Sequence, residues 1–187
     1  MTTQKAIGIV AKRLKGELVV CTTGYTCRNM QAVSDRPGNF YMIGSMGLAA
    51  SLGLGIALSK PRLQVAVFDG DGAVLMGLGS LPVIGALAPA NLIHVVFDNE
   101  VFASTGNQPT YSGSVALDAL ASAAGYRQVA RAAAPKELER EWDRLRGGTG
   151  PSFLLVKCGP DSGAPAERVR LEPEAITERF REAVNAS

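Results

Sequence analysis

Residues 64–76 read QVAVFDGDGAVLM, an apolar run that leads into a turn of glycine and aspartate. The run Gln64–Phe68 is apolar after its first residue, which is typical of a strand buried on both faces of a sheet. The turn then places Asp71 between Gly70 and Gly72, at the start of a helical pattern. Glycines let a ligand approach the backbone, and N–H groups at a helix start attract phosphate. A carboxylate there would repel phosphate unless a divalent cation lay between them, so we predict that Asp71 is a metal ligand.

The rest of the chain repeats this alternation of apolar strands and helical patterns, which predicts an α/β fold. We expect a single domain, residues 1–187, with a mostly parallel sheet covered by helices on both faces and with 160–187 as a C-terminal extension and helix. Further strands are expected at Glu17–Cys21, Leu92–Phe97, Arg127–Ala130 and Ser152–Lys157, with a short hydrophobic segment at Phe40–Ile43. Helices are expected at Thr3–Leu14, Met46–Ser59, Ala73–Leu87, Ala116–Ala123, Pro135–Arg146 and Pro173–Val184. Pro82 should kink or split the third of these helices.

Four polar loops follow the strands of this predicted sheet, and they begin at Thr22, Gly44, Asp69 and Asp98. They should meet at the carboxyl edge of the sheet, where open α/β sheets bind ligands. The amide oxygen of Asn99 is a suitable second ligand for Mg²⁺, which takes few protein ligands and completes its shell with phosphate oxygens and water. The alternative is an ordinary turn, because glycine and aspartate are common turn residues.

The composition argues against several classes of function. The 187 residues carry 19 basic and 17 acidic side chains, a net charge of +2, which is too balanced for a protein whose main partner is nucleic acid. Every apolar run is well short of 18 residues, so we expect no membrane span. The three cysteines form no CxxC pair, and we expect reduced thiols and a cytoplasmic location. A GxGxxG fingerprint and a Gly-Lys-Ser/Thr phosphate loop are both absent from the sequence.

Three stretches resemble the thiamine diphosphate-dependent decarboxylases. They are NFYMIGSMG at 39–47, GDGAVLM at 70–76 followed by Asp98 and Asn99, and STGNQPT at 104–110. The resemblance concerns the diphosphate-binding domain of that superfamily and covers nearly the whole chain. The third stretch is particular to the branch that contains the sulfopyruvate and phosphonopyruvate decarboxylases.

The resemblance implies how Mg²⁺ and the diphosphate of the cofactor are bound. Asp71, the side chain of Asn99 and the backbone carbonyl of Val101 should bind Mg²⁺. The residues that should bind the diphosphate are Thr23, Gly24, Tyr25, Gly70, Gly72 and Ala73.

The resemblance also assigns the segment Gly44-Ser45-Met46 to the thiamine rings. The carbonyl of Gly44 should accept a hydrogen bond from the cofactor's amino group, and the apolar side chain of Met46 should bend the cofactor. The superfamily usually has asparagine at the position of Asp98. An aspartate there is expected to make a structural hydrogen bond, but its role is left open.

A partner subunit is implied as well. Members of the superfamily use a glutamate on a separate pyrimidine-binding domain, for which this chain would need about 150 more residues. We therefore expect an α subunit that supplies the glutamate, in an α₂β₂ or larger assembly. The implied function is that of a β subunit of a 2-oxo acid decarboxylase. Its substrate would be a small anion, first 3-sulfopyruvate, which yields sulfoacetaldehyde and CO₂. The alternatives are a phosphonopyruvate decarboxylase, another 2-oxo acid decarboxylase or carboligase subunit, and a non-catalytic module that binds thiamine diphosphate.

Four residues are candidates for contacts with the anionic substrate. Arg28 lies beside the diphosphate loop, although an ordinary surface arginine is the favoured alternative. Asn107, Gln108 and Thr110 follow the metal ligand Asn99, and the resemblance favours a polar lid over the cofactor. The alternative for these three is an ordinary loop punctuated by Gly and Pro.

Other reactive side chains are expected to be structural. His94 falls within a buried strand, remote from its end, and Trp142 falls on a helix where packing is the expected role. Cys21 and Cys27 flank the diphosphate loop but lack a histidine partner, so nucleophilic use is not expected.

Overall fold

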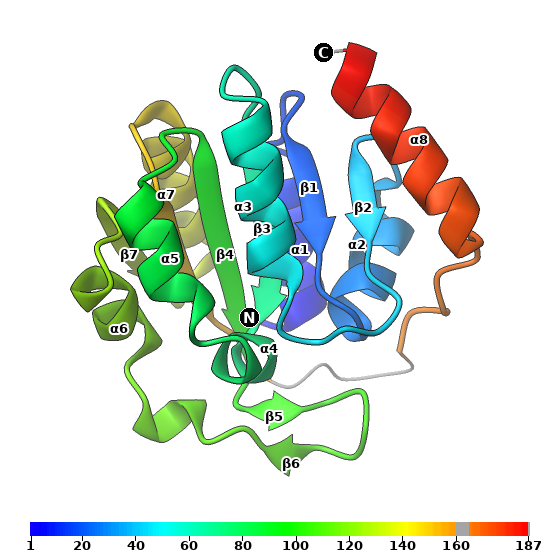
Figure 1. Ribbon diagram of the computed structural model, residues 1–187. Coiled ribbons are helices and arrows are strands. Elements are labelled where there is room, and N and C mark those ends of the chain that lie inside the picture. The colour runs from blue at the N-terminus through cyan, green and yellow to red at the C-terminus, as the bar shows by residue number, and fades with distance from the viewer. Residues whose placement is uncertain (160–164, 187) are drawn as a thin grey trace.

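The structure of the chain, a computed structural model, describes residues 1–159 and 165–186 (Figure 1). In this part of the chain six strands form a sheet in the order β2-β1-β3-β4-β8-β7, and all neighbouring strands are parallel. They are β1 Leu18–Cys21, β2 Asn39–Tyr41, β3 Val65–Gly70, β4 Leu92–Asp98, β7 Gln128–Ala132 and β8 Ser152–Lys157. A separate antiparallel hairpin consists of β5 Val101–Phe102 and β6 Gln108–Pro109. The expected strands all occur, shifted by no more than two residues at either end, and the α/β fold class is confirmed.

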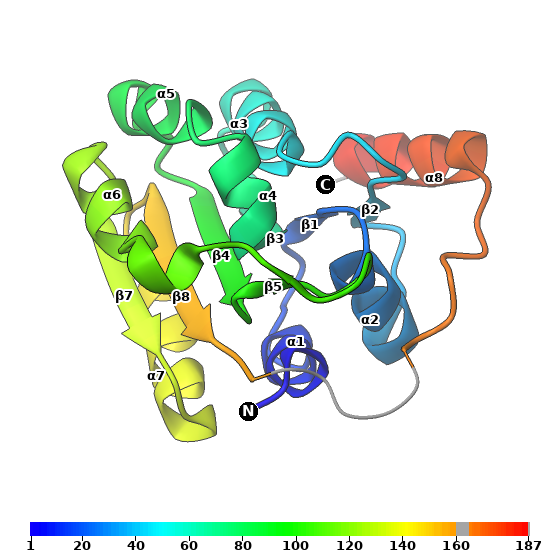
Figure 2. The same ribbon diagram turned by 90° about the horizontal axis from the view of Figure 1, so that it is seen from below.

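Helices cover both faces of the sheet (Figure 2). One face carries α1 Thr3–Ala11, α2 Tyr25–Ser34 and α7 Pro135–Gly147. The other carries α3 Ala49–Ser59, α4 Asp71–Met76, α5 Ser80–Leu87 and α6 Leu117–Ala123. Two clusters of buried apolar side chains lie between the helices and the sheet. The strands are therefore buried on both sides, as their apolar sequences predict.

The helix α7 shows how sequence signals set local structure. Pro135 occupies its first turn, where a missing N–H costs nothing, and Glu137 accepts hydrogen bonds from the backbone N–H groups of residues 133 and 134. Its apolar positions, Leu138, Trp142 and Leu145, recur at helical spacing and are buried against the sheet. The packing role predicted for Trp142 is confirmed, since its side chain is fully buried.

The predicted helix Ala73–Leu87 is divided, but not by Pro82. α4 ends at Met76 and α5 begins at Ser80, so Pro82 lies in the first turn of α5, where its missing N–H is tolerated. The break falls at Gly77, where the backbone packs directly against Gly47: a Cβ atom built on Gly77 would lie 2.0 Å from the Gly47 carbonyl oxygen. The helix therefore ends at a long-range contact that only glycine permits.

Other boundaries also differ from the prediction. α3 begins at Ala49 rather than at Met46, which lies in the turn before it, and α2 and the β5–β6 hairpin were not among the predicted elements. In the expected extension 160–187, residues 160–164 and 187 lie outside the described residues. The rest ends in α8 Pro173–Ala186, which packs beside edge strand β2. Among the described residues no helix has the length and apolar content needed to cross a membrane.

Candidate functional site

Four loops line a cavity of about 100 Å³ at the carboxyl edge of the sheet. They are the loops after β1, β2, β3 and β4, which meet because parallel strands carry their carboxyl ends to one edge. The predicted site residues that line this cavity are Thr23, Tyr25, Met46, Gly70, Asp71, Gly72, Ala73, Asn99 and Val101. Gly44 and Ser45 line the neighbouring groove instead. The structure thus brings together most of the residues that the sequence assigned to the cofactor and the metal.

The loops after β1 and β2 are joined directly. The hydroxyl oxygen of Thr23 accepts a hydrogen bond from the backbone N–H of Gly44 at 3.0 Å. Gly24 and Gly44 have φ values of 93° and 98°, in the left-handed region that favours glycine. The joint therefore fixes the expected diphosphate loop against the expected thiamine loop.

The two glycines beside Asp71 serve different purposes. A Cβ atom on Gly70 would meet no atom within 4 Å, so this position leaves room beside the cavity. A Cβ atom on Gly72 would lie 2.3 Å from the ring of Phe102, which already packs against it. Gly72 is thus required by the β5–β6 hairpin, whereas the sequence alone suggested close approach of a ligand at both glycines.

Asp71 begins α4 and is buried, with 2% of its surface exposed. The hydroxyls of Thr110 and Ser112 both contact its Oδ2 atom, Ser112 at 2.9 Å. Burial raises the pKa of Asp71, while the two hydroxyls act in the opposite direction. A cation beside the carboxylate would favour its charged form.

Three residues that line the cavity carry oxygen atoms of different kinds. Asp71 offers a carboxylate, Asn99 an amide oxygen and Val101 a backbone carbonyl. The Asn99 Oδ1 atom accepts a hydrogen bond from the Val101 N–H at 3.3 Å, which fixes the orientation of the amide. This set of hard oxygen donors fits Mg²⁺, which takes one or two carboxylates and leaves other positions to phosphate and water. Within the described residues, no three His, Cys, Asp or Glu side chains are arranged to hold a metal. The candidate ligands differ from such a cluster because Asp71 is the only one of these residue types among them.

Residues 19–156 match the family described as thiamine pyrophosphate enzyme, C-terminal TPP binding domain; thiamine pyrophosphate is another name for thiamine diphosphate. The chain belongs to the thiamine pyrophosphate enzyme family. The resemblance stated from the sequence is confirmed.

Three relatives indicate the branch of this thiamine pyrophosphate family. Phosphonopyruvate decarboxylase of Streptomyces hygroscopicus is 43% identical over 176 residues, which are 91% of this chain and 44% of that protein. Sulfopyruvate decarboxylase subunit beta of Methanothermobacter thermautotrophicus is 39% identical over 94% of this chain and 91% of its own length. The same subunit of Methanocaldococcus jannaschii is 36% identical, with 98% of both chains covered. The chain therefore spans less than half of the first relative and nearly all of the other two.

Solved structures of thiamine pyrophosphate enzymes share the fold. A putative thiamin diphosphate-dependent enzyme from Mycobacterium smegmatis superposes with a TM-score of 0.72 at 18% identity, over 86% of this chain and 32% of that one. Benzoylformate decarboxylase from Polynucleobacter necessarius also gives 0.72, at 17% identity, over 87% of this chain and 34% of that one. At these identities the likeness shows the fold alone.

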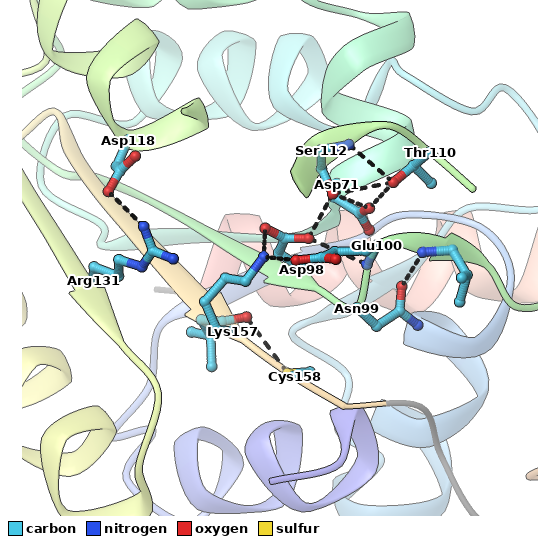
Figure 3. Close-up of polar contacts among 12 residues, drawn as sticks. Asp71, Asp98, Asn99, Glu100, Thr110, Ser112, Asp118, Arg131, Lys157 and Cys158 are labelled. Carbon is cyan, nitrogen blue, oxygen red and sulfur yellow. Dashed lines mark hydrogen bonds and ion pairs between the residues drawn. The ribbon is translucent and has the colours of Figure 1, made fainter. Parts of the chain in front are cut away.

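Asp98, where the resemblance leads us to expect asparagine, is buried and lies beside Lys157 (Figure 3). Its side chain accepts hydrogen bonds from Ser112 at 2.8 Å, from the Glu100 N–H at 3.2 Å and from Lys157 at 2.7 Å. Partial burial lowers the pKa of Lys157, but its hydrogen bonds to Asp98 and Glu100 outweigh this and raise it. Asp98 is thus held by a cation and two neutral donors.

The candidate substrate residues do not lie together. The Arg28 guanidinium stacks 5.1 Å from the Tyr25 ring centre and lines a different groove, between α2 and the segment before α8. Asn107 and Gln108 are exposed in the hairpin, outside the 100 Å³ cavity. Thr110 is buried and contacts Asp71, so it supports the carboxylate expected to bind the metal and does not belong to an exposed lid.

Sequence reasoning missed several residues that support the site. Ser112 and Phe102 lie in the segment after β4, and no local pattern indicates their contacts with Asp71 and Gly72. Lys157 could have been noticed in the sequence, because it is a charged residue at the end of a strand of otherwise apolar and small residues. Its sheet neighbour is Asp98, a pairing that needs the strand order.

The side chains expected to be structural are buried. His94 is 1% exposed and contacts Asp69 and Tyr126 at 3.2 and 3.1 Å, so its expected place in the core is confirmed. Cys27 donates to the Thr22 carbonyl at 2.9 Å, and burial raises the pKa of its thiol to about 12. A thiol this hard to ionise is a poor nucleophile, in agreement with the sequence prediction.

Proposed function

We propose that this chain is the diphosphate-binding β subunit of a thiamine diphosphate- and Mg²⁺-dependent 2-oxo acid decarboxylase whose substrate is 3-sulfopyruvate. The main support for this proposal is the cavity lined by Asp71, Asn99 and Val101, three residues with oxygen donors, next to the turn that contains Gly70 and Gly72. Family membership supports the cofactor. Coverage of 91% and 98% of two sulfopyruvate decarboxylase β subunits supports the subunit type.

The residues of this chain would bind and orient the cofactor. Asp71, Asn99 and the Val101 carbonyl would hold Mg²⁺, and the metal would neutralise diphosphate oxygens that a lone carboxylate repels. The diphosphate would be held by Thr23, Gly24, Tyr25, Gly70, Gly72 and Ala73. Gly44, Ser45 and Met46 would hold the thiamine rings. When bound, thiamine diphosphate supplies the electron sink that decarboxylation of a 2-oxo acid requires.

A companion α subunit is part of this proposal. Among the described residues that line the cavity, Asp71 is the only carboxylate, and we assign it to the metal, so the glutamate must come from elsewhere. An apolar groove of about 630 Å³ adjoins the thiamine loop, and Ile43 and Leu48 on its rim are 60% and 54% exposed. Exposed apolar side chains of this kind are typical of surfaces that a partner covers. We propose an α₂β₂ or larger assembly because closed symmetry is usual.

The proposal also specifies the anionic group of the substrate and the cellular location of the protein. A phosphonopyruvate decarboxylase is the second candidate, because the 43% identical relative carries that name. Arg28, Asn107 and Gln108 are the remaining candidates for contacts with the anionic tail. The buried thiols Cys21 and Cys27 are compatible with the cytoplasm, which we propose as the location.

Reconstitution with the companion subunit tests the function. CO₂ release should be measured with 3-sulfopyruvate, phosphonopyruvate and pyruvate, for each subunit alone and for the mixture. We expect turnover only in the mixture, with 3-sulfopyruvate preferred. Preference for phosphonopyruvate would select the second candidate. Full turnover by this chain alone would refute the divided site, and cofactor binding without turnover of any 2-oxo acid would indicate a non-catalytic module.

A further inference from the structure

Two buried carboxylates lie behind the expected metal position, separated by one hydroxyl group. Asp71 and Asp98 are 2% and 1% exposed. The Ser112 Oγ atom lies 2.9 Å from Asp71 Oδ2 and 2.8 Å from Asp98 Oδ1 (Figure 3). Two like charges so close in a buried site repel each other unless a cation offsets one of them. Bound Mg²⁺ and diphosphate together would not remove the excess negative charge of the two carboxylates, because the diphosphate is itself strongly anionic.

Lys157 is placed to offset the second carboxylate. Its ammonium group lies 2.7 Å from Asp98 Oδ2 and 2.6 Å from Glu100 Oε1. The placement is rigid, because Lys157 and Asp98 are register neighbours on the parallel strands β8 and β4. The pair differs from an ordinary surface ion pair, since the side chain of Asp98 is 2% exposed and that of Lys157 20%.

The two hydroxyls connect this ion pair to Asp71. Ser112 and Thr110 have one hydroxyl hydrogen each, and both oxygens contact Asp71 Oδ2. They also lie 3.1 Å from each other. With its single hydrogen, Ser112 donates to Asp71 or to Asp98 but not to both at once, and its oxygen packs between the two carboxylates. A shift of Asp98 would move Ser112 and, with it, the carboxylate of Asp71.

We propose that Lys157 is a positioning residue for the magnesium–diphosphate site, which acts through Asp98, Ser112 and Thr110 on the carboxylate of Asp71. The proposal rests on the proposed function, because it presumes that Asp71 binds Mg²⁺. It also gives a reason for the aspartate at 98: its carboxylate contacts the Ser112 hydroxyl, while Lys157 offsets the buried charge. A lysine that only stabilised the fold would have no effect on the Mg²⁺ requirement of cofactor binding.

The test is calorimetric titration of thiamine diphosphate into the full chain with its companion subunit, at a series of Mg²⁺ concentrations. Lys157→Met leaves the Asp98 charge buried without a partner, which is costly. We expect the Mg²⁺ concentration for half-maximal cofactor binding to rise about 10-fold, the low end of the range for loss of a direct partner of a metal ligand, because Lys157 acts through Asp98 and Ser112. The double variant Asp98→Asn/Lys157→Met removes both charges and keeps an oxygen for Ser112, so it should restore the wild-type requirement.

A matched control lies on the neighbouring strand. Arg131 of β7 pairs with Asp118 at 3.8 Å, and its side chain is 57% exposed (Figure 3). Arg131→Met should leave the Mg²⁺ requirement unchanged. Thermal unfolding of every variant, followed by circular dichroism, separates loss of fold from loss of binding.

The outcomes separate this inference from the proposed function. Wild-type protein that binds thiamine diphosphate without any Mg²⁺ dependence would refute both. Wild-type binding that depends on Mg²⁺, with an unchanged requirement in Lys157→Met, would overturn the role of Lys157 alone. A double variant as impaired as Lys157→Met would also overturn it. If Lys157→Met does not fold, Lys157→Gln takes its place, because it removes the charge and keeps an N–H donor for Asp98. A raised Mg²⁺ requirement in Lys157→Gln supports the proposal, and an unchanged one overturns it.

Discussion

Substitution of Gly77 by alanine should disturb the joint between the α4–α5 turn and the thiamine loop. A Cβ atom on Gly77 would lie 2.0 Å from the carbonyl oxygen of Gly47, 2.9 Å from its carbonyl carbon and 3.2 Å from its Cα. Since Cβ atoms are essentially never found closer than 3.0 Å to another heavy atom, the two backbone segments must separate by at least about 1 Å. Both partners are backbone, so no side chain is available to rotate away.

The expected effect has two parts. Overpacking of this kind costs about 1–3 kcal/mol. For a chain of this length that corresponds to a fall of about 2–12 °C in Tm. The second part concerns binding, because Gly47 directly follows Met46, which lines the cavity. A displacement near 1 Å in a site can cost about 100-fold in activity, so we also expect weaker binding of thiamine diphosphate.

Gly79→Ala is the matched control for this substitution. A Cβ atom on Gly79 would meet no atom within 4 Å, and its φ of −60° suits alanine. This variant should be neutral, or more stable by about 0.4–1 kcal/mol because the unfolded chain loses freedom. Differential scanning calorimetry and cofactor titration should be run on both variants. Equal Tm and equal affinity for the two would refute the argument that contact between Gly77 and Gly47 holds the thiamine loop.

Three further predictions follow from individual contacts. Asp71→Ala should abolish Mg²⁺-dependent binding of thiamine diphosphate in calorimetry, and unchanged binding would remove Asp71 from the metal site. The hydrogen bonds from Arg179 hold the pKa of Asp35 below its usual range. The pair therefore stabilises the fold fully above about pH 4, and this contribution is lost as the pH falls through the lower folded pKa. Asp35→Asn should flatten the acid limb of the curve of Tm against pH, and parallel curves for wild type and variant would contradict this. Trp142→Ala should cost about 3–5 kcal/mol in urea unfolding, because the side chain is fully buried. A loss below about 1 kcal/mol would show that the core repacks.

The sequence was a sufficient guide where a signal is local. Runs such as Leu92–Phe97 are almost entirely apolar, as expected for a strand whose two faces are both covered by helices. The strands and their burial on both faces were therefore predicted correctly. The meeting of the turn at Asp71 with the loop at Asn99 also followed, because neighbouring parallel strands carry their carboxyl ends to one edge. Local signals also placed α7, where Pro135 begins the helix and Gly148 follows it.

The division of the predicted helix at 73–87 shows where local signals were not enough. Proline is the strongest helix breaker in that segment, yet Pro82 is accommodated in a first turn, while the helix breaks at Gly77. At Gly77 the backbone contacts Gly47, thirty residues earlier in the sequence, and this contact requires glycine. No pattern within the segment itself contains that contact.

The supporting residues of the candidate site depended on the tertiary structure for the same reason. Phe102 against Gly72, and Lys157 opposite Asp98, are pairs brought together by the hairpin and by the order of the strands. Strand order results from burial of apolar surface over the whole sheet, so it is a property of the complete chain and not of any one segment. The sequence therefore predicted which residues bind a metal and a diphosphate, and the folded chain established which distant groups hold those residues in place.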